Sequence, residues 1–326
     1  MRSNQFLTAL CLGTALGSSG AAMAQDYPTE PITMIVPFAA GGPTDTVARL
    51  TAQAMSEELG QQIVVQNVGG AGGTLGAGQA AQAAPDGYTI LVHHIGMATA
   101  PSLYADLPYD AIESFAPIGL VTNAPMTIIG RGDLEPTTLE ELIEYVRANA
   151  ETVTLANAGL GAASHLCGML FAEAIDVDIT TVPYQGNGPI MTDLLGGHVD
   201  MTCDQTTNTT QPILSGDVKA YAVTTPERLA SLPDVPTAQE AGLPDFSIAV
   251  WHGLYVPAGT DAAIQERLTA ALQTALTDET LVARFAELGT DPVSAEDATP
   301  QALGDQLASQ IDFWRPFIKE AGLSPN

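Results

Sequence analysis

The stretch Ile32–Asp45 has the sequence ITMIVPFAAGGPTD and predicts a strand, a loop and the start of a helix. Ile32–Val36 is a short apolar run rich in β-branched residues, as in a buried strand. Small residues follow, and Pro43 suits the first helical position because a helix needs no N–H there. The apolar residues from Val47 to Leu59 then recur at helix spacing. A strand that leads directly into a helix is the unit of an α/β fold.

The same alternation continues along the chain. Further strands are predicted at Ile63–Val65, Tyr88–Val92, Ile118–Val121, Met126–Ile129, Val153–Ala156, Ile179–Val182, Val199–Cys203, Ala220–Thr224 and Ile248–Val256. Thr138 and Glu141 form a capping-box pattern before an apolar helix. The last third is helix-rich, at about 261–276, 278–288 and 300–320. This alternation predicts mainly parallel sheets with helices on both faces.

Two extended apolar stretches, Phe115–Gly130 and Phe246–Pro257, have weak helix propensity. We interpret them as paired crossover strands between two α/β domains. Domain 1 then consists of residues 26–124 and 249–326, and domain 2 of residues 125–248. Such a double crossover makes a hinge and an interdomain cleft, which is a natural ligand site.

Residues 1–24 have the pattern of a cleavable signal peptide. Arg2 supplies the positive end, Phe6–Leu16 is apolar, and Ala22-Met23-Ala24 is a small-x-small cleavage site. We expect a mature start at Gln25 or Asp26, after export. The alternative is a buried N-terminal helix. No later stretch approaches 18 apolar residues, so we expect a soluble exported protein.

The chain has 326 residues, with 37 acidic and 10 basic residues and a formal net charge of −27. It therefore lacks the basic surface that nucleic-acid binding requires. Its 46% hydrophobic residues exclude a disordered acidic tail. Removal of the signal peptide leaves Cys167 and Cys203. An oxidising compartment permits a disulfide between them, but two buried thiols are equally compatible with the sequence.

Glycine-rich loops recur between strands and helices, where free N–H groups and the helix dipole favour an anion. Each could also be an ordinary tight turn. Besides the first loop, these segments are Gly69–Gly76, Asn157–His165, Val182–Pro189 and Asp200–Asn208. Ser164 can donate its hydroxyl, and Tyr184 can offer a ring or a hydroxyl or can simply fill the core. Asp204 ends an apolar strand and either accepts from a ligand or caps a helix.

Catalytic and cofactor motifs are missing from the sequence. It has no Gly-x-Ser-x-Gly elbow and no His-Glu-x-x-His helix, and its five histidines fit no standard metal spacing. Gly76–Ala81 matches a loose dinucleotide fingerprint, but it lies within a helical pattern rather than directly after a strand. We expect no cofactor and no metal. His93 and His94 close a strand and can line the cleft, although each taken singly is more often structural.

The motifs together resemble the solute receptors of tripartite tricarboxylate transporters, also called Bug receptors. The resemblance extends over the mature chain, in order. Its segments are Ile35–Asp45, Gly69–Gly76, Pro85–Tyr88, Gly161–Leu166, Val182–Tyr184, Asp193–Asp200, Leu232–Thr237 and Gly253–Pro257.

The resemblance implies a type II-like periplasmic binding protein whose two domains close on an organic carboxylate. The ligand would be a di- or tricarboxylate, or an aromatic acid such as terephthalate. The partners would be the large and small membrane subunits of the transporter, and the receptor would be a monomer. The implied ligand-binding residues are Phe38, Ala39, Ala40, Gly41 and Thr44 in the first domain, and Ala158, Ser164, Tyr184, Gly186 and Asp204 in the second. The His93-His94 pair departs from the small polar residues expected there, and we include His94 in the site.

Two other functions fit the same fold. One is an exported hydrolase that uses Ser164 or Asp204, although the sequence offers no evident general base. The other is a sensor that presents its ligand to a signalling receptor.

Overall fold

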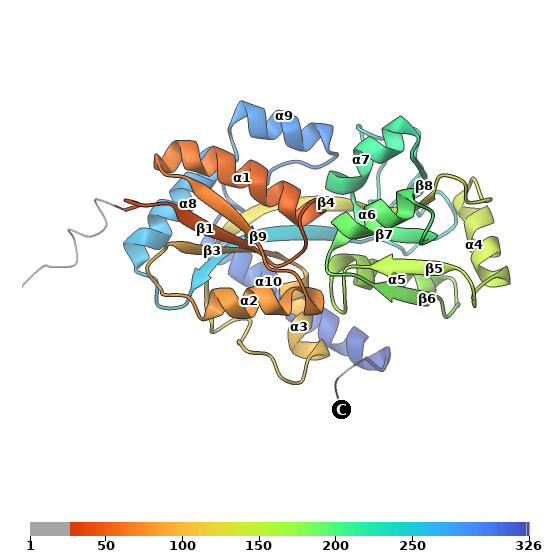
Figure 1. The fold of residues 1–326 in the computed structure, drawn as a ribbon, viewed down its shortest axis with the longest axis horizontal. Helices are drawn as coiled ribbons and strands as arrows, with labels where there is room; N and C mark the ends of the chain where they lie inside the picture. Colours follow the sequence, from red (N-terminus) through yellow and green to blue (C-terminus); the bar gives the residue numbers. More distant parts are fainter. Residues whose placement is uncertain (1–26, 324, 326) are drawn as a thin grey trace, which may run out of the picture.

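The computed structural model describes residues 27–323 and 325 and shows two α/β lobes side by side (Figure 1). The predicted signal peptide, 1–24, lies outside the described residues. Lobe 1, at the left of Figure 1, contains the N-terminal strands and the C-terminal helices. Lobe 2 contains the middle of the chain. In the described part of the chain, no helix combines the length and the apolar character needed to cross a membrane.

The strands form one continuous path across both lobes, in the order β2-β1-β3-β9-β4-β7-β5-β6, with β8 paired to β4. Their bounds are β1 Ile32–Val36, β2 Ile63–Asn67, β3 Thr89–His94, β4 Phe115–Arg131, β5 Thr154–Asn157, β6 Thr180–Pro183, β7 Met201–Gln205, β8 Val218–Val223 and β9 Ala249–Pro257. Lobe 1 contains β1, β2 and β3 in parallel, and lobe 2 contains β5, β6 and β7 in parallel.

The long strands β4 and β9 join the two lobes. They pair antiparallel from Phe115 opposite Pro257 to Pro125 opposite Ala249. From Met126 onward β4 pairs with β7 and β8 instead. The two strands predicted at Ile118–Val121 and Met126–Ile129 are thus one strand that serves both lobes. The sheet is mixed rather than mainly parallel, because β4 and β9 run antiparallel to the strands beside them. The predicted domain boundaries, at 124/125 and 248/249, stay a prediction.

Helices cover both faces of the sheet. In lobe 1, α1 and α9 lie on one side, and α2, α3 and α10 lie on the other (Figure 1). The lobe 1 helices are α1 Pro43–Leu59, α2 Thr74–Ala81, α3 Gly96–Leu103, α8 Ala262–Ala275, α9 Glu279–Glu287 and α10 Pro300–Glu320, and a 3₁₀ turn η1 spans Ala71–Gly73. The lobe 2 helices are α4 Leu139–Ala148, α5 Ala163–Ala174, α6 Asn187–Leu195 and α7 Thr206–Ser215.

Each helix buries its apolar stripe against the sheet. In α10, for example, Leu303, Leu307, Ile311, Trp314 and Ile318 are buried at spacings of three and four residues. The helix thereby packs on α3 and β4. The predicted capping box at Thr138 is only half formed. Its hydroxyl accepts from the Glu141 N–H at 3.2 Å, whereas the Glu141 carboxylate accepts from Thr137.

Candidate functional site

A small cavity lies where the two lobes meet. Its volume is about 10 Å³, which is about the room of one water molecule. An organic acid can therefore enter only if the loops of the two lobes move apart. The lining residues are Phe38, Gly42, Pro43, Thr44 and His94 from lobe 1, and Ala158, Ala162, Ala163, Asn187 and Gln205 from lobe 2.

Four helices begin at this cavity. They are α1, α5, α6 and α7, whose N-cap residues are Gly42, Ala162, Gly186 and Gln205. In none of the four does the N-cap side chain accept from the first turn. The first N–H groups of a helix have no partner inside the helix, and the helix dipole adds a partial positive charge there. Their convergence makes a region suited to an anion, although no Lys or Arg is among the described residues that line it.

The first loop, Pro37–Gly42, is held in shape from within lobe 1. Asp45, in the first turn of α1, accepts from the Gly41 N–H at 2.9 Å and from the Asn67 amide at 2.9 Å. The same Asn67 amide donates to the Phe38 carbonyl at 3.1 Å. Arg49, one turn later, pairs with Asp45 at 2.9 Å. Hydrogen bonds from Arg49, Gly41 and Asn67 outweigh burial and lower the pKa of Asp45. The loop is therefore positioned before any ligand arrives.

The loops of the two lobes contact each other directly. The Ala39 N–H donates across the cleft to the Gln185 carbonyl at 3.0 Å. Two further hydrogen bonds join the lobes. The Tyr104 hydroxyl donates to the Leu160 carbonyl at 2.8 Å and the Thr99 hydroxyl to the Gly161 carbonyl at 3.0 Å. A Cβ on Gly186 would lie 2.7 Å from the Ala39 nitrogen, so this approach requires glycine.

In lobe 2, Ser164 organises the loop that precedes α5. Its hydroxyl oxygen accepts from the Ala158 N–H at 2.9 Å and donates to the Asn187 side-chain oxygen at 3.4 Å. Ser164 is buried and links the loop to the start of α6. Tyr184 points elsewhere, because its hydroxyl donates to Asp193 at 2.6 Å. Burial and the neighbouring Asp193 carboxylate raise the pKa of Tyr184 to about 12.

Three buried histidines of lobe 1 cluster together, and one of them, His94, lines the cavity. His94 stacks on Phe38, with ring centroids 4.6 Å apart, and lies edge-on to both His93 and His252. Burial lowers the pKa of His93 and of His252 to about 3 and holds the pKa of His94 well below 6.5. All three rings are therefore neutral. Because Nδ1 of His94 accepts from the Gly96 N–H at 2.9 Å, its hydrogen is on Nε2, which makes Nε2 a donor.

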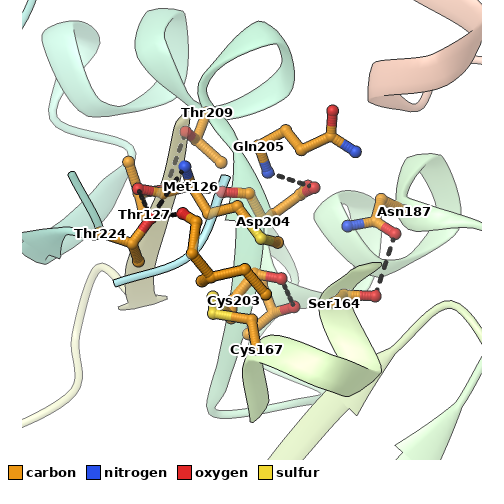
Figure 2. Close-up of a disulfide and its surroundings, with 12 residues drawn as sticks. Met126, Thr127, Ser164, Cys167, Asn187, Cys203, Asp204, Gln205, Thr209 and Thr224 are labelled. Carbon is orange, nitrogen blue, oxygen red and sulfur yellow. Dashed lines mark hydrogen bonds between the residues drawn. A yellow bond between two sulfur atoms is a disulfide. The ribbon is translucent and has the colours of Figure 1, made fainter. Parts of the chain in front are cut away.

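The end of β7 provides the polar part of lobe 2 (Figure 2). The Asp204 carboxylate accepts from the Gln205 N–H at 2.7 Å and from the Asn208 amide at 2.6 Å. Its complete burial raises its pKa to about 7, and hydrogen bonds from Asn208, Gln205 and Asn187 oppose this rise. Next to it, Cys203 of β7 and Cys167 of α5 form a disulfide, with Cα atoms 5.9 Å apart.

The structure brings the predicted residues together around one region, but only some of them line the cavity. Phe38, Thr44, His94 and Ala158 do so. Of the others, Gly41 donates to Asp45 and Tyr184 is bound to Asp193. Six predicted residues do not line the cavity but lie within two residues of one that does: Ala39, Ala40, Gly41, Ser164, Gly186 and Asp204. Their contact with a ligand stays a prediction. Sequence reasoning missed Asn187 and Gln205, although both lie in loops that it selected.

A larger hollow on the surface does not suit an anion. It has a volume of about 490 Å³ and lies between α5, residues 242–247 and α10. Its lining includes Glu173 and Asp245 and no basic side chain among the described residues. Within 27–323 and 325, no group of three or more His, Cys, Asp and Glu side chains is placed to hold a metal ion.

The fold has two α/β lobes that are joined by paired long strands, and loops of both lobes line a cavity between them. This arrangement is that of a solute-binding protein of the periplasmic type. The comparisons agree. The family described as the tripartite tricarboxylate transporter family receptor matches residues 47–323, and the chain belongs to this family.

Relatives and solved structures are similar over nearly the whole chain. The UPF0065 protein in the TAR-I ttuE-ttuC' intergenic region of Agrobacterium vitis is 52% identical over 98% of this chain and 92% of its own. The structure of the periplasmic binding protein BugD has a TM-score of 0.90 at 50% identity, and covers 92% of this chain and 100% of that chain. MatC from Rhodopseudomonas palustris, solved with bound malate, has a TM-score of 0.86 at 40% identity, and covers 89% and 99%. The family is described as a receptor family, BugD as a periplasmic binding protein, and MatC as a protein with malate bound.

Proposed function

We propose that this protein captures a short organic dicarboxylate in the periplasm for a tripartite tricarboxylate transporter. The observation that carries the proposal is the meeting of four helix N-termini, without side-chain caps, at one cavity between the lobes. Backbone N–H groups bind carboxylates with charge-assisted hydrogen bonds. MatC, which shares the fold at 40% identity, is described with malate bound.

Neutral donors are well suited to a protein of this charge. A net charge of −27 repels an anion at long range, so the field of the protein does not attract the ligand. Close to the cavity, the N–H groups, the Thr44 hydroxyl and the neutral His94 ring all offer hydrogens. Affinity therefore rests on local geometry, and we expect added salt to speed association by screening the repulsion.

Ligand binding would also change the arrangement of the two lobes, which the membrane subunits can recognise. A bound acid would contact loops of both lobes and so favour their closed arrangement. We propose that the exported chain, cleaved before Gln25 or Asp26, presents this arrangement to the large and small membrane subunits.

Calorimetry on the mature chain tests the binding function. The panel contains malate, succinate, citrate, terephthalate and acetate, with glucose and arginine as controls. We expect heat of binding with at least one dicarboxylate and none with the controls. If no organic anion binds, the proposal is wrong.

Two further measurements test the absence of turnover and the partnership. The bound acid should be recovered unchanged after long incubation, because the Ser164 hydroxyl contacts Ala158 and Asn187 and is bonded to no histidine among the described residues. A strain that lacks this gene should lose uptake of the acid identified by calorimetry. Normal uptake in that strain would contradict the transport role.

A further inference from the structure

We propose that Gln205 sets ligand specificity, because its side-chain oxygen accepts a hydrogen bond from a donor on the ligand. The ligand class is then a dicarboxylate with a hydroxyl or ammonium group beside a carboxylate, rather than the plain acid. This inference rests on the proposed function, since it concerns the same cavity.

The Gln205 side chain lines the cavity with one polar atom unsatisfied. Gln205 is 2% exposed, and its Oε1 is buried without a hydrogen-bond partner among the described residues. A buried acceptor that has no partner destabilises the folded protein relative to one that is paired. A donor on a ligand that enters the cavity can supply this hydrogen bond.

Several other polar groups at the cavity are donors. They include the first N–H groups of four helices, the Thr44 hydroxyl and Nε2 of His94. A carboxylate has only acceptor oxygens, so it can satisfy these groups but not Gln205 Oε1. A hydroxyl or an ammonium on the same ligand supplies the missing hydrogen.

The backbone at Gln205 is held by hydrogen bonds to Asp204 and its neighbours. Its N–H donates to Asp204 at 2.7 Å, and Asn208 donates to the other oxygen of that carboxylate at 2.6 Å. The Thr127 hydroxyl donates to the Asp204 carbonyl at 3.1 Å. Figure 2 shows the Gln205 side chain extending away from the disulfide, on the side where Asn187 lies. An acceptor that extends from a held backbone is confined to a small part of the cavity, which favours ligands that place a donor there.

The test compares malate, aspartate and succinate, which share a four-carbon dicarboxylate skeleton and differ at one carbon. Calorimetry on the mature protein should give a dissociation constant for malate or aspartate at least about tenfold lower than for succinate. In Gln205→Met, which keeps the size and removes the acceptor, the preference should fall to about twofold or less. Most of the change should come from weaker binding of the favoured ligand. The malate and aspartate titrations distinguish a hydroxyl from an ammonium donor.

A matched control is available on the same helix. Gln211 of α7 is exposed, so Gln211→Met makes the same chemical change away from the cavity and should leave all three constants unchanged. Equal affinity of the wild-type protein for the three acids would overturn the inference while leaving the proposed function intact. An unchanged preference in a folded Gln205→Met would overturn it as well. If no dicarboxylate binds, the proposed function and this inference both fail.

Discussion

Helices that meet at the cavity begin differently from four of the helices that lie away from it. Four helices away from the cavity have an N-cap side chain that accepts from their first turn, and these caps are Thr138 of α4, Asp261 of α8, Asp278 of α9 and Thr299 of α10. The four cavity helices begin at Gly42, Ala162, Gly186 and Gln205, without such a bond.

This difference shows where the protein gives up local stability. A Thr or Asp cap typically stabilises a helix by about 1 kcal/mol relative to Ala. The cavity helices forgo this stabilisation, and their first N–H groups stay available to an external anion. The lack of a cap is not confined to the cavity, because α2 and α3 also begin without one, at Gly73 and Ile95. What distinguishes the four cavity helices is that their uncapped ends meet at one place.

The largest expected effect comes from giving a cavity helix the cap that outer helices have. In Ala162→Asp, the new carboxylate can accept from the first-turn N–H groups of α5 and so take the place of the ligand. We expect dicarboxylate affinity to fall by about 100-fold or more, because a fixed negative charge then lines the cavity. Calorimetry measures this, with circular dichroism to check the fold. Ala162→Ser is the neutral control and should lose much less affinity. Unchanged affinity in a folded Ala162→Asp would contradict the assignment of this cavity.

A smaller effect concerns the acid buried beside the cavity. The pKa of Asp204 is about 4 in an unfolded chain and about 7 in the folded protein. Between pH 4 and pH 7 the Asp204 carboxyl group is protonated in the folded protein and ionised in the unfolded chain. The free energy of unfolding should therefore fall as the pH rises from about 4 to about 7. Above pH 7 this contribution is constant. The slope is about 1 kcal/mol per pH unit.

Urea unfolding of the wild type and of Asp204→Asn isolates this contribution from the other acidic residues. Between pH 5 and pH 7, the wild type should lose about 2 kcal/mol more than the variant. The difference should persist in 0.5 M salt, because a buried group is little screened. Parallel pH curves for the two proteins would show that Asp204 does not titrate in this range.

The smallest expected effect comes from removing an outer cap. Asp278→Ala deletes the acceptor for the Leu281 N–H and should cost about 1 kcal/mol of unfolding free energy. The dissociation constant of the ligand should stay the same, because α9 contributes nothing to the cavity lining. Urea unfolding and calorimetry on the same sample check both halves of this prediction. A weakened ligand affinity would show that outer and cavity helices are not independent.

Much of this architecture could be predicted from sequence because it depends on local patterns. The apolar run Ile32–Val36 and the helix after Pro43 are both present. The helix α7 is harder to predict, because its sequence TTNTTQPILS is rich in β-branched residues and contains a proline. Tertiary contacts support it instead. The hydroxyls of Thr206 and Thr210 donate to the carbonyls of Gly289 and Leu288, at 3.0 and 3.1 Å.

The site was predictable at the level of loops but not of side chains. A glycine-rich loop before a helix indicates an anion site through backbone chemistry alone. Which side chains turn into the cavity depends on distant partners. The Tyr184 hydroxyl is bonded to Asp193, and the backbone N–H of Gln205 is bonded to Asp204. A single sequence contains no signal for either choice.

The disulfide ties this protein to the conditions in which it is made. Both Cys167 and Cys203 are buried, at 0% and 2% exposure, so small thiols and oxidants have little access to them once the lobe has packed. The bond must therefore form while the chain is still open. Preparations made in a reducing cytosol would contain free thiols at the point where α5 meets β7. The two cysteines are 36 residues apart in the sequence and adjacent in space. The compartment in which the protein is expressed therefore decides whether an affinity is measured on the disulfide-bonded or the reduced form.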